Sequence, residues 1–510
     1  RDSAELMDRI QRGPTNWLVD RPRREGGVRL ALDAYRRWYV DLPWNLRQKV
    51  EERWGTPEED PFLDADGFSL SVLQMGNAVV GVQPARGYNI DPKDSYHSPD
   101  LAPPHNYLAF YAWLRNEHRT DAIVHFGKHG NLEWLPGKAL ALSEECFPEA
   151  VLGPVPHLCP FIVNDPGEGT QAKRRTSAVI LDHLTPPLTR AESYGPIKDL
   201  EALVDEFYEA SGMDRRRLEY LRREIRSILV EEKLDIDAGI TPQMDEEAAL
   251  QKLDTYLCEL KESQIRDGLH VFGSAPAGDL ERDLAIAILR IPRGDGRGSN
   301  ASLIRALALD CGIDAEAFDP LDCVLGAPWQ GPRHKFLITA GGGADVWRTN
   351  GDTVERLELL AQLAVQWTET PKHFHNTRAV LETLHGETIP ALRACGDTER
   401  AALVDGLDGR FVDPGPSGAP TRGRSDVLPT GRNFYSVDSR AVPTPAAWAL
   451  GWASAQRLVE HHLQTHGDWP RTMLLTAWGT SNMRTGGDDI AQGLALMGAR
   501  PTWDSASRRV

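Results

Sequence analysis

The segment DAIVHFGKHGNLEWLPGK, residues 121–138, constrains the fold more than any other part of the sequence. It places His125, His129 and Glu133 at intervals of four residues, so on a regular helix these side chains would share one face. Two glycines lie inside this span and a proline follows it. Because two interior glycines would cost a helix about 2 kcal/mol, the segment does not favour a helix.

A strand followed by a loop explains the segment better. The apolar residues of DAIVHF predict a buried strand, and GKHGNLEWLPG then forms the loop at its carboxyl end. In open α/β sheets, ligands bind at the carboxyl ends of the strands. Two imidazoles and a carboxylate could ligate a borderline metal there. The alternative is that the histidines only make hydrogen bonds that shape the loop.

The composition indicates a large, acidic, multidomain protein. Its 510 residues predict about two to four domains. The 57 Lys and Arg residues against 74 Asp and Glu residues give a net charge of −17, which argues against a nucleic acid or an anionic membrane as partner. No apolar run approaches the roughly 20 residues that a membrane helix needs.

The cysteines are scattered and form no CxxC pair. They are Cys146, Cys159, Cys258, Cys311, Cys323 and Cys395. This spacing predicts free thiols in the reducing cytoplasm, and neither a disulfide framework nor a zinc site. The sequence begins at Arg1 without a methionine and stops at Val510, so we expect both ends to be cuts through a longer chain.

Alternating helix and strand signals predict an α/β protein of several domains, with mixed sheets, flanking helices and a charged helical segment. Residues 1–55 predict amphipathic helices interrupted at Pro43. Residues 68–91 predict strands joined by tight glycine loops. An apolar helix, a short turn and the strand Ala122–Phe126 follow.

The later part of the chain is richer in helix signals. Charged helices are expected within residues 195–265, and further helices at 280–312, 352–367, 376–395 and 445–466. Strands are expected at Lys335–Ala340 and 472–479, and an exposed or ligand-facing loop at 410–433. The expected regions are 1–100 (helical, then an α/β entry), 101–195 (α/β core with the His/Glu loop), 196–400 (helix-rich) and 401–510 (loop plus α/β part).

The sequence contains no convincing nucleotide site. GNLEWLPGK has six residues between Gly130 and Gly137 where a phosphate-binding P-loop has four, and no Ser or Thr follows Lys138. ITAGGGADVW is glycine-rich but lacks the dinucleotide spacing. The sequence therefore predicts no nucleotide site on this chain.

Three further loops resemble the His/Glu loop in being polar and rich in glycine. NDPGEGTQAKRR leads into a helix with Arg174 and Arg175, whose guanidinium groups suit carboxylate partners, although a surface charge run is the alternative. The others are LPTGRNFYSVDSRAVPT, with Arg432, Asn433, Asp438 and Arg440, and AWGTSNMRTGGDDIAQ, with Thr480, Asn482 and Arg484. Four loops of one kind suggest a shared cleft.

Several of these motifs, in this order, resemble the family of the cobaltochelatase large subunit, which also contains the magnesium chelatase H subunit. They are GNAVVGVQPARGYNIDP, VHFGKHGNLEWLPGKALALS, NDPGEGTQAKRR, DGLHVFG, LPTGRNFYSVDSRAVPT and WGTSNMRTGGDDIAQGLALMGARPTWD. The resemblance covers residues from about 40 to 510. Within the family, Trp134-Leu135 and Ala139 resemble the cobalt branch, since magnesium-type subunits carry Phe-Met and Gln there.

The resemblance implies a function in aerobic cobalamin biosynthesis. The large subunit would bind hydrogenobyrinic acid a,c-diamide and cobalt(II) as substrates and act as a ligase that forms nitrogen–metal bonds. An AAA+ ATPase subunit and its integrin-like partner subunit would hold ATP and magnesium, which agrees with the missing P-loop. The alternatives are magnesium insertion into protoporphyrin IX and a non-catalytic tetrapyrrole-binding protein. An unrelated zinc hydrolase would need an HExxH helix, which the sequence lacks.

The resemblance also implies roles for individual residues. Glu133 matches the family's functional glutamate and would accept the pyrrole protons or hand over the metal, with His125 and His129 as transient metal ligands. Arg174, Arg175, Arg432 and Arg440 are candidates to clamp the carboxylates of the substrate. Asn433, Asp438, Thr480, Asn482 and Arg484 are candidates to line the pocket.

Overall fold

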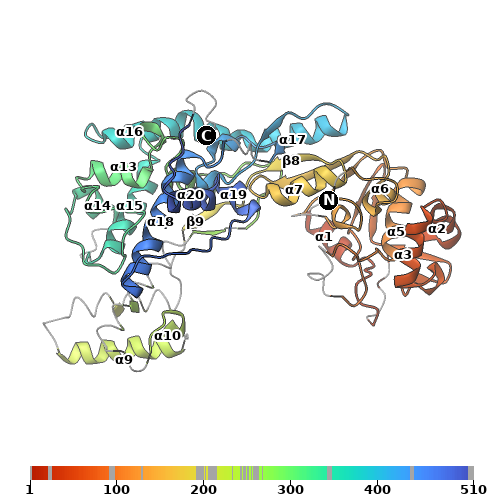
Figure 1. Cartoon of the computed structure of the whole chain (residues 1–510), viewed down its shortest axis with the longest axis horizontal. Helices are drawn as coiled ribbons and strands as arrows, with labels where there is room; N and C mark the ends of the chain where they lie inside the picture. The colour runs from red at the N-terminus through yellow and green to blue at the C-terminus, as the bar shows by residue number, and fades with distance from the viewer. Residues whose placement is uncertain are drawn as a thin grey trace. The chain divides into compact units, whose positions relative to one another are not determined.

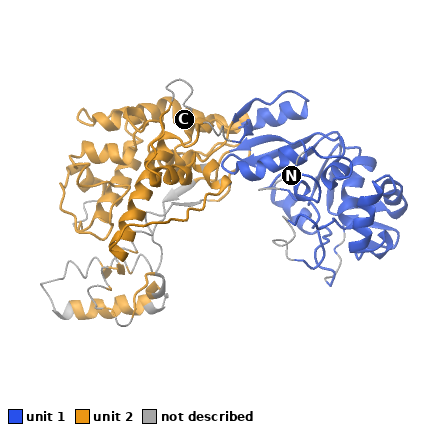
Figure 2. Ribbon diagram, viewed as in Figure 1, with its two compact units in different colours: residues 1–183, 399–415, 431–436 blue, residues 184–398, 416–430, 437–510 orange. Residues whose placement is uncertain are grey.

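The computed structural model divides the chain into two compact units. It describes residues 3–20, 24, 26–90, 98–127, 130–139, 141–190, 200, 203–204, 215–231, 234–241, 244, 249, 252–253, 256, 264–266, 268–341, 347–436, 441–503 and 510. Unit 1 contains residues 1–183, 399–415 and 431–436, and unit 2 contains residues 184–398, 416–430 and 437–510 (Figure 2). The expected boundary near residue 100 falls inside unit 1.

Unit 1 begins with helices packed on a small antiparallel sheet. The helices are α1 (Ser3–Gln11), α2 (Leu32–Tyr39) and α3 (Trp44–Trp54), and the sheet has the order β1-β3-β2. Its strands are β1 (Val28–Ala31), β2 (Leu63–Asp64) and β3 (Gly67–Leu70), followed by the hairpin β4 (Val72–Met75) and β5 (Ala78–Gly81). The predicted helix break is confirmed, since α3 begins directly after Pro43. The predicted strands after residue 67 are also confirmed.

A parallel α/β layer forms the rest of unit 1 (Figure 1). The strands β6 (Ile123–Val124), β7 (His157–Ile162) and β8 (Val179–His183) pair in sequence order. The connections contain helix α6 (Phe147–Leu152) and helix α7 (Pro166–Arg175). Helix α5 (His105–Ala112) is buried along its whole length, because apolar and aromatic side chains surround it. It continues into the π-helical turn η2 (Trp113–Glu117), which contains the buried Trp113 and Leu114.

The segment at 410–433 differs from the predicted exposed loop. It contains strand β11 (Pro414–Pro416) and the short helices η6 (Pro420–Arg422) and η7 (Ser425–Val427). Val412, Val427 and Leu428 are buried in it. Strand β12 (Asn433–Tyr435) pairs with β11 and packs against β8. The high Gly and Pro content therefore marks tight turns in a segment that is packed in part. The prediction of an exposed loop was wrong for the three buried residues and holds for Phe411, which is 80% exposed.

Unit 2 is mainly helical. Its helices include α9 (Arg215–Glu231), α10 (Leu234–Asp237), α12 (Asp279–Arg290), α13 (Leu303–Asp310), α14 (Lys335–Ala340), α15 (Asn350–Ala364), α16 (His375–Thr383), α18 (Pro445–His466), α19 (Gly479–Thr485) and α20 (Asp488–Leu496). Helix α17 (Ile389–Leu407) starts in this unit, and β9 (Leu188–Arg190) pairs with β10 (Gln264–Arg266). Helix α9 carries the predicted charged pattern, and the mixture of helices and sheets agrees with the α/β class.

Two strand predictions in this unit were wrong. Lys335–Ala340 forms helix α14, whose first turn is capped by the His334 side chain accepting from the Phe336 amide. Residues 472–478 pair with no strand, and Leu474 is 96% exposed. Short apolar runs do not distinguish helix from strand by periodicity alone.

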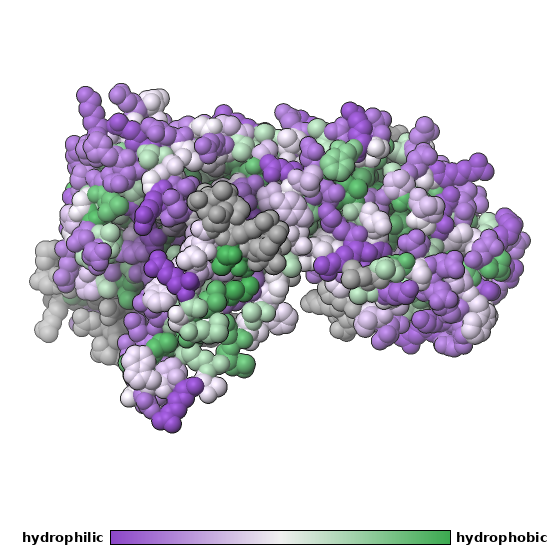
Figure 3. All heavy atoms as spheres, turned by 45° about the horizontal axis from the view of Figure 1, so that its top comes forward, coloured by the Kyte–Doolittle hydropathy of each residue, from purple (hydrophilic) through white to green (hydrophobic). Residues whose placement is uncertain are grey.

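Figure 3 shows hydrophobic surface gathered on the visible face of unit 2.

None of the helices in the described ranges combines the length and the apolar character needed to cross a lipid bilayer.

Candidate functional site

The predicted strand and loop are confirmed at the start of the site. Strand β6 ends at Val124, and the next amide, of His125, still donates to the carbonyl of Leu158 in β7 at 2.9 Å. The chain then turns into the short helix η3 (Leu132–Trp134), in which Glu133 is only 1% exposed. The sheet therefore places His125 at a strand end and Glu133 inside the protein.

Arg175 holds the loop that carries Glu133. Its guanidinium donates to three backbone carbonyls, those of Glu133 at 2.8 Å, Leu135 at 2.8 Å and Lys138 at 3.1 Å. Arg175 is the last residue of α7 and is 7% exposed. These three bonds from one guanidinium fix the backbone of the loop around Glu133. We therefore move Arg175 from the predicted substrate clamp to a positioning role.

Gly130 lets the acidic and imidazole groups approach one backbone position. A Cβ atom at residue 130 would lie 3.0 Å from Glu133 Oε2, 3.3 Å from His125 Nδ1 and 3.6 Å from Gln83 Oε1. The first two distances are shorter than ordinary contacts, so a larger residue would push these groups apart. Gly130, which argued against a helix in the sequence, therefore also leaves room for Glu133 and His125.

His125 is the outer member of a pair of imidazoles. Its Nδ1 lies 3.0 Å from His157 Nε2, and His157 Nδ1 lies 2.9 Å from Thr176 Oγ1. Burial lowers the pKa of His125 to about 3, with a smaller contribution from the neighbouring His157. Burial also lowers the pKa of His157 to about 4. Both rings are therefore neutral near pH 7, which is the form that binds metal.

Polar groups from α5 and the segment after β5 complete the cluster. Gln83 donates to the Tyr111 hydroxyl at 2.6 Å and accepts from the Asn131 amide at 2.9 Å. Tyr107 donates to Asn131 Oδ1 at 2.7 Å. The Tyr111 hydroxyl lies 3.4 Å from His125 Nε2. Burial raises the pKa of both tyrosines, so their hydroxyl groups stay protonated and serve as donors.

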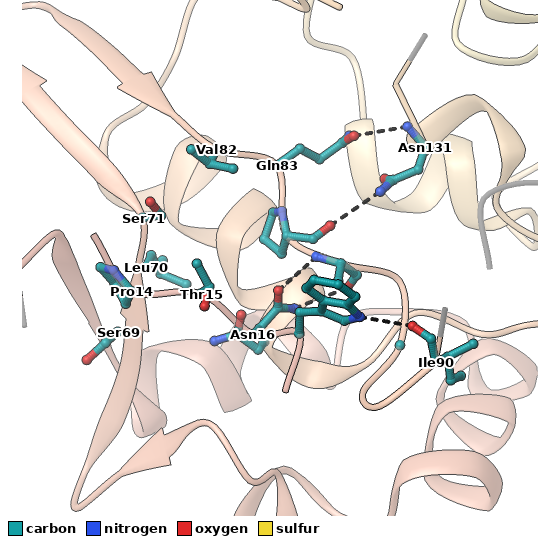
Figure 4. Close-up of a pocket in the computed structure, with 15 residues that line it drawn as sticks. Pro14, Thr15, Asn16, Ser69, Leu70, Ser71, Val82, Gln83, Ile90 and Asn131 are labelled. Carbon is teal, nitrogen blue, oxygen red and sulfur yellow. Dashed lines mark hydrogen bonds between the residues drawn. The ribbon is translucent and has the colours of Figure 1, made fainter. Parts of the chain in front are cut away.

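A cavity of about 280 Å³ borders this cluster (Figure 4). Its wall includes Gln83 and Asn131, which Figure 4 shows joined by their hydrogen bond, together with Asn16 and Ile90. This volume is below the about 300–1,000 Å³ of sites for drug-sized ligands. We therefore do not assign a whole macrocycle to it.

The residues around β12 are used for packing. Lys173 donates to Asn433 Oδ1 at 2.6 Å and to the Phe434 carbonyl at 2.7 Å. Asn433 Oδ1 also accepts from the Ile180 amide at 3.1 Å. These bonds tie β12 to α7 and β8, so the Asn433 side chain is already engaged within unit 1.

Arg432 and Arg174 differ in their surroundings. The amide of Arg432 donates to Asp182 Oδ1 at 2.7 Å, as does the amide of Gly431 at 2.7 Å. Asp182 is fully buried, and burial raises its pKa to about 7. The Arg174 side chain is exposed. Arg174 therefore remains available to bind an anionic group from solution.

The other predicted site residues lie outside the described residues or in unit 2. His129, Asp438 and Arg440 lie outside the described residues, and so do the side chains of Thr480 and Arg484. Asn482 belongs to α19, in unit 2, where it bonds to its own neighbourhood. Segments 125–133 and 164–175 belong to unit 1, segment 478–487 belongs to unit 2, and the remaining segment, 428–440, is divided between the two units. The shared cleft of four loops thus stays a prediction.

Within the described ranges, which omit His129, no group of three His, Cys, Asp or Glu side chains is arranged to hold a metal ion. The predicted metal set of His125, His129 and Glu133 therefore stays a prediction.

His157, Gln83 and Tyr111 were not predicted from the sequence. His157 lies in the otherwise apolar strand HLCPFI. A polar residue in a buried strand is the sequence feature that could have indicated its place in the site. Gln83 and Tyr111 join the site only because the fold brings the β5 exit and α5 to the loop, and no local pattern indicates this.

The fold and this cluster define a multidomain α/β protein with imidazole and carboxylate groups at a strand end of a parallel sheet. The chain belongs to the CobN/magnesium chelatase family, because the family model described as CobN/Magnesium Chelatase matches residues 1–510. This confirms the resemblance inferred from the motifs.

Individual relatives are similar over nearly the whole chain. An aerobic cobaltochelatase subunit CobN from Sinorhizobium is 58% identical over 100% of this chain and 41% of its own length. The CobN protein from Pseudomonas aeruginosa is 54% identical, over 99% of this chain and 40% of its own length. The H subunit of magnesium chelatase from Chlorobaculum parvum is 29% identical, over 98% of this chain and 39% of its own length.

A solved structure agrees with these relatives. The catalytic subunit of cobaltochelatase from Mycobacterium tuberculosis superposes with a TM-score of 0.76 at 41% identity, covering 99% of this chain and 41% of that chain. The chain thus spans about two fifths of the length of the relatives it matches.

Proposed function

We propose that this chain is the part of an aerobic cobaltochelatase that receives cobalt(II) and places it in a tetrapyrrole. The substrate would be hydrogenobyrinic acid a,c-diamide, in aerobic cobalamin biosynthesis in the cytoplasm. An AAA+ ATPase subunit with its integrin-like partner would hydrolyse ATP with magnesium. The observation that carries the proposal is that the buried Glu133 carboxylate and the His125 imidazole approach the same backbone position, Gly130.

The chemistry of insertion requires groups of this kind. A macrocycle must lose its inner pyrrole protons while the ion loses water. The carboxylate of Glu133, whose backbone carbonyl accepts from Arg175, can accept a proton. An imidazole whose pKa is about 3 keeps its lone pair at neutral pH. His129 joins His125 as the second transient ligand in this proposal.

Sequence similarity supports cobalt as the metal. The identity to subunits named for cobalt is 58% and 54%, against 29% for a magnesium-chelatase subunit. Imidazole ligands also suit cobalt better than magnesium, which prefers oxygen donors and water.

Arg174 and Arg432 are proposed to bind carboxylates of the substrate, together with Arg440. The exposure of the Arg174 side chain supports this assignment for Arg174. Asp438, Thr480 and Arg484 remain proposed pocket residues.

A metal-competition assay tests the function. The full-length subunit, assembled with its ATPase partners, is offered Co²⁺ and Mg²⁺ together, with hydrogenobyrinic acid a,c-diamide in one reaction and protoporphyrin IX in the other. We expect ATP-dependent cobalt insertion into the first and no magnesium insertion into the second. Magnesium insertion into protoporphyrin would overturn the cobalt assignment, and pigment binding without insertion would overturn catalysis.

A further inference from the structure

The ring of His157 contacts His125, and the hydrogen bonds along Thr176, His157 and His125 run in one direction. The proposed function does not require this direction. We propose that His157 is a positioning residue that fixes the tautomer of His125, so that Nε2 of His125 carries the lone pair offered to the metal. The inference rests on the proposed function only for the identity of the ligand that His125 binds.

The direction of these hydrogen bonds is set by Thr176. Its hydroxyl donates to the carbonyl of Ala172 in the preceding turn at 2.8 Å. A hydroxyl has one proton, so the Thr176 oxygen can only accept from His157 Nδ1, at 2.9 Å. His157 Nδ1 is therefore the protonated ring nitrogen.

The next step follows from the chemistry of one ring. His157 is 3% exposed, and among the described residues its ring nitrogens contact Thr176 and His125 and no carboxylate, so a buried imidazolium would be costly. A neutral imidazole protonated at Nδ1 has an unprotonated Nε2. The contact of 3.0 Å between His157 Nε2 and His125 Nδ1 then needs a proton on His125 Nδ1. The Nε2 atom of His125 is left with its lone pair.

The outer face of His125 is arranged so that a metal can replace a weak contact. The Tyr111 hydroxyl lies 3.4 Å from His125 Nε2, which is long for a hydrogen bond. Gln83 donates to the same hydroxyl at 2.6 Å. The backbone amide of Asn131 donates to Gln83 Oε1 at 2.9 Å and thereby orients the side-chain amide of Gln83. Tyr111 can therefore keep a strong bond when Nε2 takes another partner.

The backbone fixes the positions of His157 and Thr176 next to His125. His157 is paired with Ile123 across the parallel strands β6 and β7, two residues before His125. Thr176 follows the last residue of α7, next to Arg175. The same end of α7 thus orients the imidazole pair and the loop of Glu133. When a residue that orients a metal ligand is lost, metal affinity or activity typically falls by about 10- to 100-fold.

The tautomer can be measured without turnover. In the chain labelled with ¹⁵N-histidine, nitrogen chemical shifts identify the protonated ring atom of His125, assigned by the loss of its signals in His125→Gln. We expect the proton on Nδ1. His157→Leu should release this preference, and His157→Gln should keep it because Oε1 can still accept from His125. His118→Leu is a matched control, since the ring of His118 stacks on Trp113.

The functional arm uses Co²⁺ in the assembled complex. His157→Leu should raise the KM for Co²⁺ by about 10- to 100-fold, with an unchanged KM for the tetrapyrrole, and His157→Gln should recover most of this loss. A proton on His125 Nε2 in the unmodified chain, or a tautomer that His157→Leu leaves unchanged, would overturn the inference. A tautomer that responds while the KM for Co²⁺ does not would instead overturn the ligand role of His125 in the proposed function.

Discussion

The His/Glu loop in unit 1 and the polar corner before α20 in unit 2 look alike in sequence but differ in their contacts. In unit 1, the backbone carbonyl of Glu133 accepts from Arg175 and the ring of His125 contacts His157, and both partners lie more than 30 residues away in the chain. In unit 2, Asn482 donates to the Trp478 carbonyl at 2.9 Å and to Asp489 at 3.0 Å. Its oxygen accepts from the Ile490 amide at 3.3 Å.

The difference separates a loop held by distant parts of the chain from a loop held by its own neighbours. All partners of Asn482 lie within eight residues, so its polar groups are used to build the corner between α19 and α20. The partners in unit 1 come from α5, β7 and α7, and they fix side chains that face one backbone position. Long-range support for reactive groups is typical of functional sites.

Glu133→Gln should have the largest effect. The substitution keeps the shape of the side chain but removes its negative charge and its ability to accept a proton. We expect insertion to slow by about 10²–10⁴-fold, with normal tetrapyrrole binding. The rate is measured in the complete complex, with the exposed Glu145→Gln as control. Near-normal insertion by Glu133→Gln would contradict the proton-acceptor role and remove the contrast with unit 2.

Arg175→Leu should cost about 2–3 kcal/mol in the free energy of unfolding of the chain, because the buried carbonyls of Glu133 and Leu135 and the partly buried carbonyl of Lys138 lose their donor. Urea unfolding measures the change. The neighbouring Arg174→Leu is the matched control, with a change within about 0.5 kcal/mol for an exposed residue, but with weaker binding of the tetrapyrrole. Equal stability losses would refute the positioning role of Arg175, and an unchanged dissociation constant would remove Arg174 from the clamp.

Asp182→Asn should change how stability depends on pH. Burial raises the pKa of Asp182 to about 7, so the folded protein holds this proton at a pH where the unfolded chain has lost it. Stability from this group therefore falls as pH rises from about 4 to about 7, by at most about 1.4 kcal/mol per pH unit. The Asn oxygen can still accept from Gly431 and Arg432, so the variant should lose only this slope. Urea unfolding at a series of pH values measures it, and parallel stability curves for the two proteins over this range would contradict the account.

Asn482→Ala should have the smallest effect. Loss of its local hydrogen bonds should lower the free energy of unfolding by about 1 kcal/mol, while the insertion rate of the folded protein stays unchanged. Thermal unfolding and the insertion assay measure the two quantities. A specific loss of insertion would place Asn482 in the pocket after all and break the comparison between the two loops.

The sequence was informative where local chemistry decides the structure. The glycines at 127 and 130 excluded a helix, Pro43 marked a helix start, and the motifs identified the family. The sequence could not decide whether the apolar run at Lys335–Ala340 would find a strand partner, and it formed a helix.

The roles of neighbouring residues also depend on the fold. Arg174 and Arg175 are indistinguishable in sequence, and the direction of α7 decides which one is buried. His157 reaches His125 only through the register of β6 and β7, which pairs Ile123 with His157. Such register depends on partners far away in the chain, so local patterns cannot reveal it.

The most direct test of the account is the environment of cobalt bound to the complete complex before insertion. Cobalt X-ray absorption, recorded with Co²⁺ and tetrapyrrole but without ATP, should show imidazole scattering. His125→Ala should remove part of this scattering, whereas His385→Ala, at an exposed position in unit 2, should leave it unchanged. An identical cobalt spectrum in His125→Ala and the unmodified protein would contradict the claim that this loop receives the metal.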